Sequence, residues 1–126
     1  MTDQSLEACQ ILIVDDEPRN IRILEEILED YRIQTASTGD ECLRLLQGMI
    51  PKIIFLDVMM PGIDGYEVCR RIKGDAKFND TKVFLVSGKA MEEERQEGLA
   101  AGADQYITKP FGMDAILVAV ERVLGT

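Results

Sequence analysis

Five short apolar runs, each followed by a stretch with helical periodicity, set the pattern of this chain. Apolar runs rich in branched and aromatic residues are typical of strands that are buried on both faces of a sheet. The predicted strands cover residues 10–15, 31–36, 52–57, 82–87 and 104–108. Apolar residues at helical spacing predict helices over about 18–28, 38–46, 64–74, 91–101 and 113–124. This alternation predicts an α/β fold, in which parallel strands joined by right-handed crossovers carry helices on both faces.

Local signals support the ends of several of these elements. Pro18 stands where the first turn of a helix tolerates proline, and Gly102 is placed to end the helix that precedes it. The polar residues in the run 31–36 indicate a strand at an edge of the sheet. Two pairs of residues have the spacing of a capping box at a helix start, Thr38 with Glu41 and Asp64 with Glu67.

Polar side chains follow the apolar runs at the points where the strands end. Asp15 and Asp16 follow the first strand, Asp57 and Ser87 end the third and fourth, and Lys109 follows the fifth. Because parallel strands end at the same edge of a sheet, where α/β proteins have their ligand crevice, we expect these side chains to share one pocket. A Pro/Gly turn follows Asp57 directly, so its carboxylate closes a central, buried strand. Burial of such a group is costly unless other groups compensate its charge.

The predicted pocket has the composition of a phosphoryl-transfer site that uses a divalent ion. Three neighbouring carboxylates favour a hard cation with oxygen ligands, and Mg²⁺ keeps several waters while binding one or two carboxylates and a phosphate oxygen. Ser87 can donate a hydrogen bond to one phosphoryl oxygen, and Lys109 can place a positive charge beside another. Asp57 is then the candidate nucleophile.

Composition narrows the class of protein. A chain of 126 residues has the size of one domain with one core, so we expect a single domain over residues 1–126 with its core at about 10–124. The formal net charge of −9 opposes direct binding to nucleic acid or to an anionic membrane. The three cysteines are widely spaced and lack a CxxC pair, which is typical of free thiols. No signal peptide or membrane-spanning run is present, so we expect a cytoplasmic protein.

Together these pieces resemble a known family. The chain is similar to the receiver domains of two-component response regulators, including the chemotaxis-type regulators, from about residue 10 to residue 124. Any one matching segment is weak, whereas all of them in order at strand ends form a specific signature. The matching segments are ILIVDDE (11–17), LDVMMPGIDG (56–65), VSG (86–88), GADQY (102–106) and KPF (109–111).

The resemblance implies a fold and a set of roles. The fold is flavodoxin-like, a doubly wound five-stranded parallel sheet in the order 2-1-3-4-5 with five helices. Asp57 accepts a phosphoryl group from a phosphohistidine on a sensor histidine kinase or a histidine phosphotransfer protein. Asp16 and Asp57 bind Mg²⁺ directly, Asp15 acts through water, and the backbone carbonyl of Met59 completes the protein ligands. The Lys109–Pro110 peptide bond is expected to be cis.

The resemblance also implies a conformational switch. Ser87 and Lys109 hold the acyl phosphate, and Ser87 and Tyr106 then move together so that the aromatic ring turns inward. The surface over residues 91–124 changes its partners as a result. Met59 and Lys89, each two residues beyond a pocket residue, are candidates for controlling the access of water to the acyl phosphate. The downstream effector, the cognate kinase and the oligomeric state are not encoded in any motif, and the chain can be a stand-alone regulator or a piece of a longer one.

Other interpretations of the same residues remain open. Asp15 and Asp16 can cap the following helix, Ser87 can be an ordinary strand-end hydroxyl, and Lys109 can be a surface lysine. An aspartyl-phosphate phosphohydrolase of the haloacid-dehalogenase type also has a strand-end aspartate, but it needs a second acid where Met59 stands. An inert interaction module with the same fold is the third possibility. A dinucleotide site is excluded because no GxGxxG follows the first strand.

Overall fold

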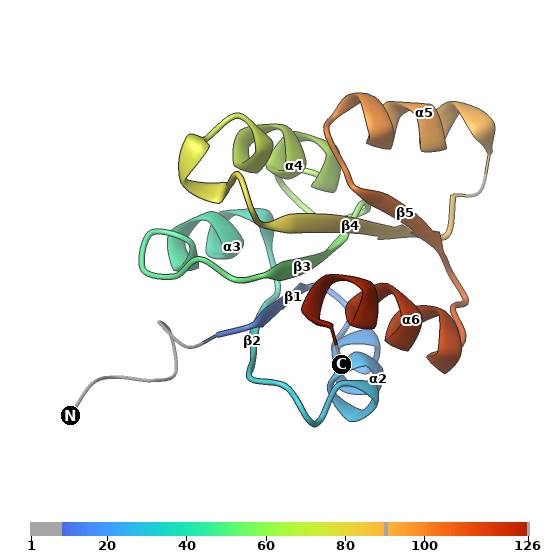
Figure 1. Ribbon diagram of the computed structural model, residues 1–126. Helices are drawn as coiled ribbons and strands as arrows, with labels where there is room; N and C mark the ends of the chain where they lie inside the picture. The colour runs from blue at the N-terminus through green and yellow to red at the C-terminus, as the bar shows by residue number, and fades with distance from the viewer. Residues whose placement is uncertain (1–8, 90, 126) are drawn as a thin grey trace.

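The computed structural model describes residues 9–89 and 91–125 and has one parallel sheet at its centre. The strand order is β2-β1-β3-β4-β5, which confirms the predicted flavodoxin-like order 2-1-3-4-5 (Figure 1). β2 pairs only with β1, which confirms the prediction that the run 31–36 forms a strand at an edge of the sheet. The strands are β1 (Ile11–Val14), β2 (Ile33–Ala36), β3 (Ile53–Asp57), β4 (Lys82–Ser87) and β5 (Gln105–Thr108).

Five α-helices cover the two faces of this sheet, as predicted. α3, α4 and α5 lie on one face, and α2 and α6 lie together on the other (Figure 1). A short 3-10 helix between α4 and β4, at Ala76–Phe78, was not predicted. The α-helices are α2 (Pro18–Ile27), α3 (Gly39–Leu45), α4 (Gly65–Lys73), α5 (Glu92–Ala100) and α6 (Met113–Leu124).

The strand residues supply two cores, one on each side of the sheet. Alternate residues of β1, β3 and β4 point to opposite faces because side chains alternate along a strand. On the first face Leu56 and Leu85 are fully buried with residues of α3 and α4, and on the second Phe55 and Phe84 pack edge to face. The central strands are therefore apolar on both faces, as the continuous runs in the sequence require.

Side-chain caps fix where α3 and α4 begin. Thr38 accepts a hydrogen bond from the backbone N–H of Glu41 at 3.0 Å, and Asp64 accepts one from Glu67 at 3.0 Å. The return bonds of a full capping box are replaced by others. The Glu41 carboxylate accepts from the backbone N–H of Ser37, and the Glu67 carboxylate pairs with arginines one turn further along α4.

The register of the sheet brings the predicted pocket residues to one level. Asp57 at the end of β3 pairs with Val86 of β4, so Ser87 stands one residue beyond it. Ser87 in turn pairs with Thr108 of β5, and the backbone N–H of Lys109 donates to the Ser87 carbonyl at 2.7 Å.

None of the helices in the described ranges has the length and apolar character needed to cross a bilayer.

Candidate functional site

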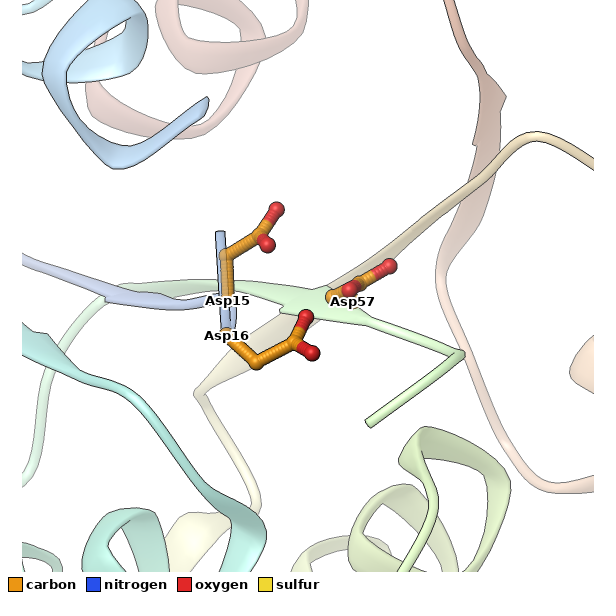
Figure 2. A group of neighbouring side chains, drawn as sticks. All are labelled: Asp15, Asp16 and Asp57. Atoms are coloured by element: carbon orange, nitrogen blue, oxygen red, sulfur yellow. The ribbon is translucent and has the colours of Figure 1, made fainter. Parts of the chain in front are cut away.

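Three carboxylates meet at the carboxyl end of the sheet. Asp15 and Asp16 leave the end of β1, Asp57 ends the neighbouring β3, and their carboxylates are directed to the same side (Figure 2). One oxygen from each lies within 4.8 Å of the others. Asp15 and Asp57 are buried and Asp16 is exposed, so the cluster opens to solvent on the side of Asp16.

Lys109 supplies the positive charge that this cluster needs. Its ammonium Nζ lies 3.2 Å from Asp57 Oδ1 and 3.4 Å from Asp15 Oδ2. The other Asp15 oxygen accepts a hydrogen bond from the backbone N–H of Glu17 at 2.8 Å, which orients that carboxylate. The sequence prediction that residues from separate segments share one pocket is thus met by Asp15, Asp16, Asp57 and Lys109.

Burial makes the ionised form of the Asp57 carboxylate unfavourable. Only 3% of the residue is exposed, and burial, followed by repulsion from Asp15, raises its pKa to about 6. The Lys109 ammonium opposes this rise in pKa and does not cancel it. The free pocket therefore holds more negative charge than its single lysine compensates, which is the condition under which a cation binds favourably.

The turn after β3 holds the Asp57 backbone at close quarters with α4. A Cβ added at Gly65 would come within 2.3 Å of the Asp57 carbonyl oxygen, so only glycine fits this approach. Gly62 adopts a φ of 80°, the left-handed region that favours glycine. The backbone N–H of Gly65 also donates to the Val58 carbonyl at 2.9 Å, which closes the turn. The Pro/Gly segment in the sequence therefore places α4 directly against the end of the Asp57 strand.

Ser87 is in position at the pocket edge but is occupied locally. Its side chain is fully buried, and its Oγ accepts a hydrogen bond from the backbone N–H of Lys89 at 3.0 Å. The hydroxyl proton of Ser87 is not used in that bond and stays available for donation.

Met59 and Lys89, the two candidates for controlling the access of water, are both exposed. Met59, two residues beyond Asp57, is more than half exposed and lies outside the core, and Lys89 is exposed as well. The peptide bond between Lys109 and Pro110 is cis, as expected.

Tyr106 lies inward, and it has a partner that sequence reasoning missed. The Tyr106 hydroxyl donates to the Lys89 carbonyl at 2.9 Å, and only 6% of the residue is exposed. Its oxygen lies 3.5 Å from the hydroxyl oxygen of Tyr66 in the first turn of α4. The sequence signal for this contact was Tyr66 itself, which stands directly after the glycine-rich turn. Nothing in the helical pattern of α4 links Tyr66 to Tyr106, which lies 40 positions away.

The donor set fits a magnesium ion. Mg²⁺ is bound in proteins through one or two carboxylates together with waters and phosphate oxygens. Here one carboxylate oxygen from each of Asp15, Asp16 and Asp57 lies within 4.8 Å of the others, and the exposed Asp16 leaves one side open for water. No histidine is present in the chain, and the three cysteines are buried elsewhere, which speaks against a nitrogen or sulfur site for a softer metal.

Comparison with known proteins places this geometry in a family. The profile of the response regulator receiver domain family matches residues 11–121. PilG of Pseudomonas aeruginosa is 33% identical over 94% of this chain and 90% of its own length. PleD of Caulobacter vibrioides is 40% identical over 93% of this chain, which spans only 26% of that protein. The structure of the BeF3-activated DrrB receiver domain superposes with a TM-score of 0.85 at 34% identity, covering 94% of this chain and 98% of that one.

Proposed function

The chain belongs to the response regulator receiver domain family, and from that premise we propose that it is a phosphorelay switch whose phosphoacceptor is Asp57. The phosphodonor is a phosphohistidine on a sensor histidine kinase or on a histidine phosphotransfer protein. The observation that carries the proposal is the convergence of Asp57 with Asp15, Asp16 and Lys109 from three separate strand ends.

We infer the roles of the individual metal-binding residues from the resemblance to the family, on the three carboxylates that the structure brings together. Asp16 and Asp57 would bind Mg²⁺ directly, Asp15 would bind through a water molecule, and the Met59 carbonyl would be the remaining protein ligand. When bound, Mg²⁺ neutralises the charge on the transferring phosphoryl oxygens. The charge balance of the pocket supports a cation at this site, because burial and the neighbouring Asp15 raise the pKa of Asp57 to about 6.

The chemical step is an in-line displacement at phosphorus. One carboxylate oxygen of Asp57 forms the new P–O bond while the P–N bond of the donor breaks, and the electron pair of that bond stays on the imidazole nitrogen. The product is an acyl phosphate on Asp57. Lys109, now 3.2 Å from the Asp57 carboxylate, shifts to one phosphoryl oxygen, and the unused Ser87 hydroxyl proton is donated to another. Later attack by water on phosphorus returns the carboxylate and releases inorganic phosphate.

The output of the switch is a change on the surface of α5, β5 and α6. Ser87 is joined through Lys89 to Tyr106, so a movement of the Ser87 hydroxyl toward the phosphoryl group acts on the segment that leads into α5. Such a switch needs only a modest coupling energy, about 1–3 kcal/mol, to change the populations of two states. The effector that responds to this surface is a further protein or domain.

A groove beside the pocket gives the donor protein a place to dock. The groove has a volume of about 290 Å³ and lies between α2 and the loop that joins β5 to α6. Ile23 is 41% exposed in this groove, next to Lys109. Exposed apolar side chains at the entrance to a charged pocket are suited to a partner that brings its phosphohistidine over Asp57. The lining residues are Asn20, Ile23, Lys109, Pro110 and Phe111.

Labelling with a small-molecule phosphodonor tests the proposal. The wild-type protein with acetyl phosphate and Mg²⁺ should gain one phosphoryl group, and Asp57→Asn should gain none. Repeated turnover of phosphate esters by the wild-type protein would instead indicate a phosphohydrolase. Absence of both label and turnover, with no effect of Mg²⁺ on thermal unfolding, would indicate an inert module with this fold.

A further inference from the structure

Tyr66 and Tyr106 form a buried pair of hydroxyl groups between α4 and β5. Both residues are nearly inaccessible, with 5% and 6% of their surfaces exposed, and their hydroxyl oxygens are 3.5 Å apart. The Tyr66 hydroxyl also donates to the Glu94 carbonyl in the first turn of α5 at 3.2 Å. The pair therefore joins three elements, α4, α5 and β5.

Counting protons assigns the donors in this pair. A tyrosine hydroxyl has a single proton to donate. Tyr106 uses its proton on the Lys89 carbonyl at 2.9 Å, the shortest of the three contacts, so Tyr66 is the donor between the two hydroxyls. Its single proton is shared between the Tyr106 oxygen and the Glu94 carbonyl. Burial, followed by the hydrogen bond to Tyr106, raises the pKa of Tyr66, so this proton is retained at neutral pH.

The inward position of the Tyr106 ring also depends on shape. A Cβ added at Gly98 of α5 would come within 2.8 Å of the ring, so the absence of a side chain there makes room for it. The guanidinium of Arg95 lies 5.8 Å from the ring centroid and covers the ring from α5. These contacts accommodate the ring, whereas the Tyr66 hydroxyl is a side-chain group within hydrogen-bond distance of the Tyr106 hydroxyl.

A series of hydrogen bonds that passes through the Lys89 backbone links this pair to Ser87 at the edge of the acidic pocket. The Ser87 Oγ accepts from the Lys89 N–H, the Lys89 carbonyl accepts from Tyr106, and Tyr106 contacts Tyr66, which donates to Glu94. Each member contacts the next within 3.5 Å. The series ends on the backbone of α5, at a helix that carries part of the proposed output surface.

We propose that Tyr66 is a positioning residue, whose hydroxyl holds Tyr106 in its inward orientation before any phosphoryl group is present and fastens the start of α5 to α4. This inference deepens the proposed function, on which its regulatory meaning rests. A ring that is already inward has less distance to travel on phosphorylation, so Tyr66 sets the basal level of the switch. Removal of its hydroxyl lowers that level and enlarges the response to phosphorylation.

The variant Tyr66→Phe tests this proposal, because it keeps the buried ring and removes only the hydroxyl. With ring-¹³C-labelled tyrosine, the Tyr106 resonance reports the balance of buried and exposed ring in the unphosphorylated protein, and a Tyr106→Phe variant assigns it. The contact between the two hydroxyls is long for an O–H···O hydrogen bond, so its loss should raise the ratio of exposed to buried ring about twofold, the low end of the effect of one hydrogen bond. An unchanged Tyr106 resonance in Tyr66→Phe would overturn the proposal.

Tyr31→Phe is the matched control, because Tyr31 packs in the core on the opposite face of the sheet. This variant should leave the Tyr106 resonance unchanged, and a shift equal to that of Tyr66→Phe would refute a specific role for Tyr66. Phosphorylation with acetyl phosphate and Mg²⁺ is measured on the same samples. A Tyr106 shift without any phosphoryl label would retain the positioning role and refute the proposed function, and a label without the shift would do the reverse.

Discussion

Replacing Asp57 by asparagine should stabilise the metal-free protein, although it removes the proposed phosphoacceptor. Asparagine has the shape of aspartate without its charge, and its amide oxygen can still accept a hydrogen bond from Lys109. The charge that it removes is buried beside Asp15, and these two causes raise the pKa of Asp57 from 3.8 to about 6. The substitution therefore relieves an unfavourable charge in the folded state only.

The size of this effect follows from the linkage between pKa and stability. A rise in pKa from 3.8 to about 6 corresponds to about 3 kcal/mol of destabilisation at pH values above 6, where Asp57 is ionised in both states. As the pH falls below 6, the folded protein takes up a proton that the unfolded chain does not, so the destabilisation shrinks to about 1 kcal/mol at pH 4.5. Below 3.8 both states are protonated and the destabilisation disappears.

Urea unfolding of the metal-free proteins, followed by circular dichroism, measures this difference. Asp57→Asn should be more stable than the wild-type protein by about 3 kcal/mol at about pH 7.5 and by about 1 kcal/mol at about pH 4.5. The matched control is Asp80→Asn, which removes a carboxylate from an exposed position and should change stability by less than about 0.5 kcal/mol. Equal or lower stability of Asp57→Asn at pH 7.5, or a gain that does not depend on pH, would refute the electrostatic argument.

Three further changes test the architecture and the metal site. Gly65→Ala places a Cβ 2.3 Å from the Asp57 carbonyl oxygen and should destabilise by about 3 kcal/mol in urea unfolding, whereas Gly88→Ala, with nothing within 4 Å, should be tolerated. Thr38→Ala should cost about 1 kcal/mol through loss of the α3 cap, and Thr38→Ser, which keeps the hydroxyl, should restore most of it. Mg²⁺ at about one hundred times its Kd should stabilise the wild-type protein by about 2.7 kcal/mol in thermal unfolding, and Asp16→Asn should require a higher Mg²⁺ concentration for the same gain. Equal stability of the two glycine variants, an unaffected Thr38→Ala protein, or an unchanged Mg²⁺ response in Asp16→Asn would each contradict the corresponding contact.

Most of the fold was predictable because local and global signals agree along this chain. The strand at Lys82–Ser87 and the helix at Met113–Leu124 have the predicted bounds, since an abrupt change of hydrophobic period marks each of their ends. The 3-10 helix at Ala76–Phe78 was missed because three residues are too short to show a period. Glu41 was expected to complete a capping box and instead accepts from Ser37, a choice that depends on the path of the chain before α3.

The site was predictable from topology and much less so in its contacts. Parallel strands place Asp15, Asp57 and Lys109 at one edge of the sheet, however far apart they are in the sequence. The polar residues at the predicted strand ends were therefore enough to predict a shared pocket. The contact of Tyr66 with Tyr106 depends on how α4 packs against the sheet and α5, and no spacing rule encodes it. The contact of Lys109 with both Asp15 and Asp57 likewise depends on how the side chains are placed in the folded pocket, which the sequence does not specify.

Locating the phosphoryl group on the chain tests the central claim most directly. The wild-type protein is treated with acetyl phosphate and Mg²⁺, reduced with borohydride, and digested for mass spectrometry, because borohydride converts an aspartyl phosphate to homoserine. We predict homoserine at position 57 and at no other aspartate, with none formed when Mg²⁺ is withheld. Homoserine at Asp15 or Asp16 in place of Asp57, or a label that forms equally well without a divalent ion, would contradict it.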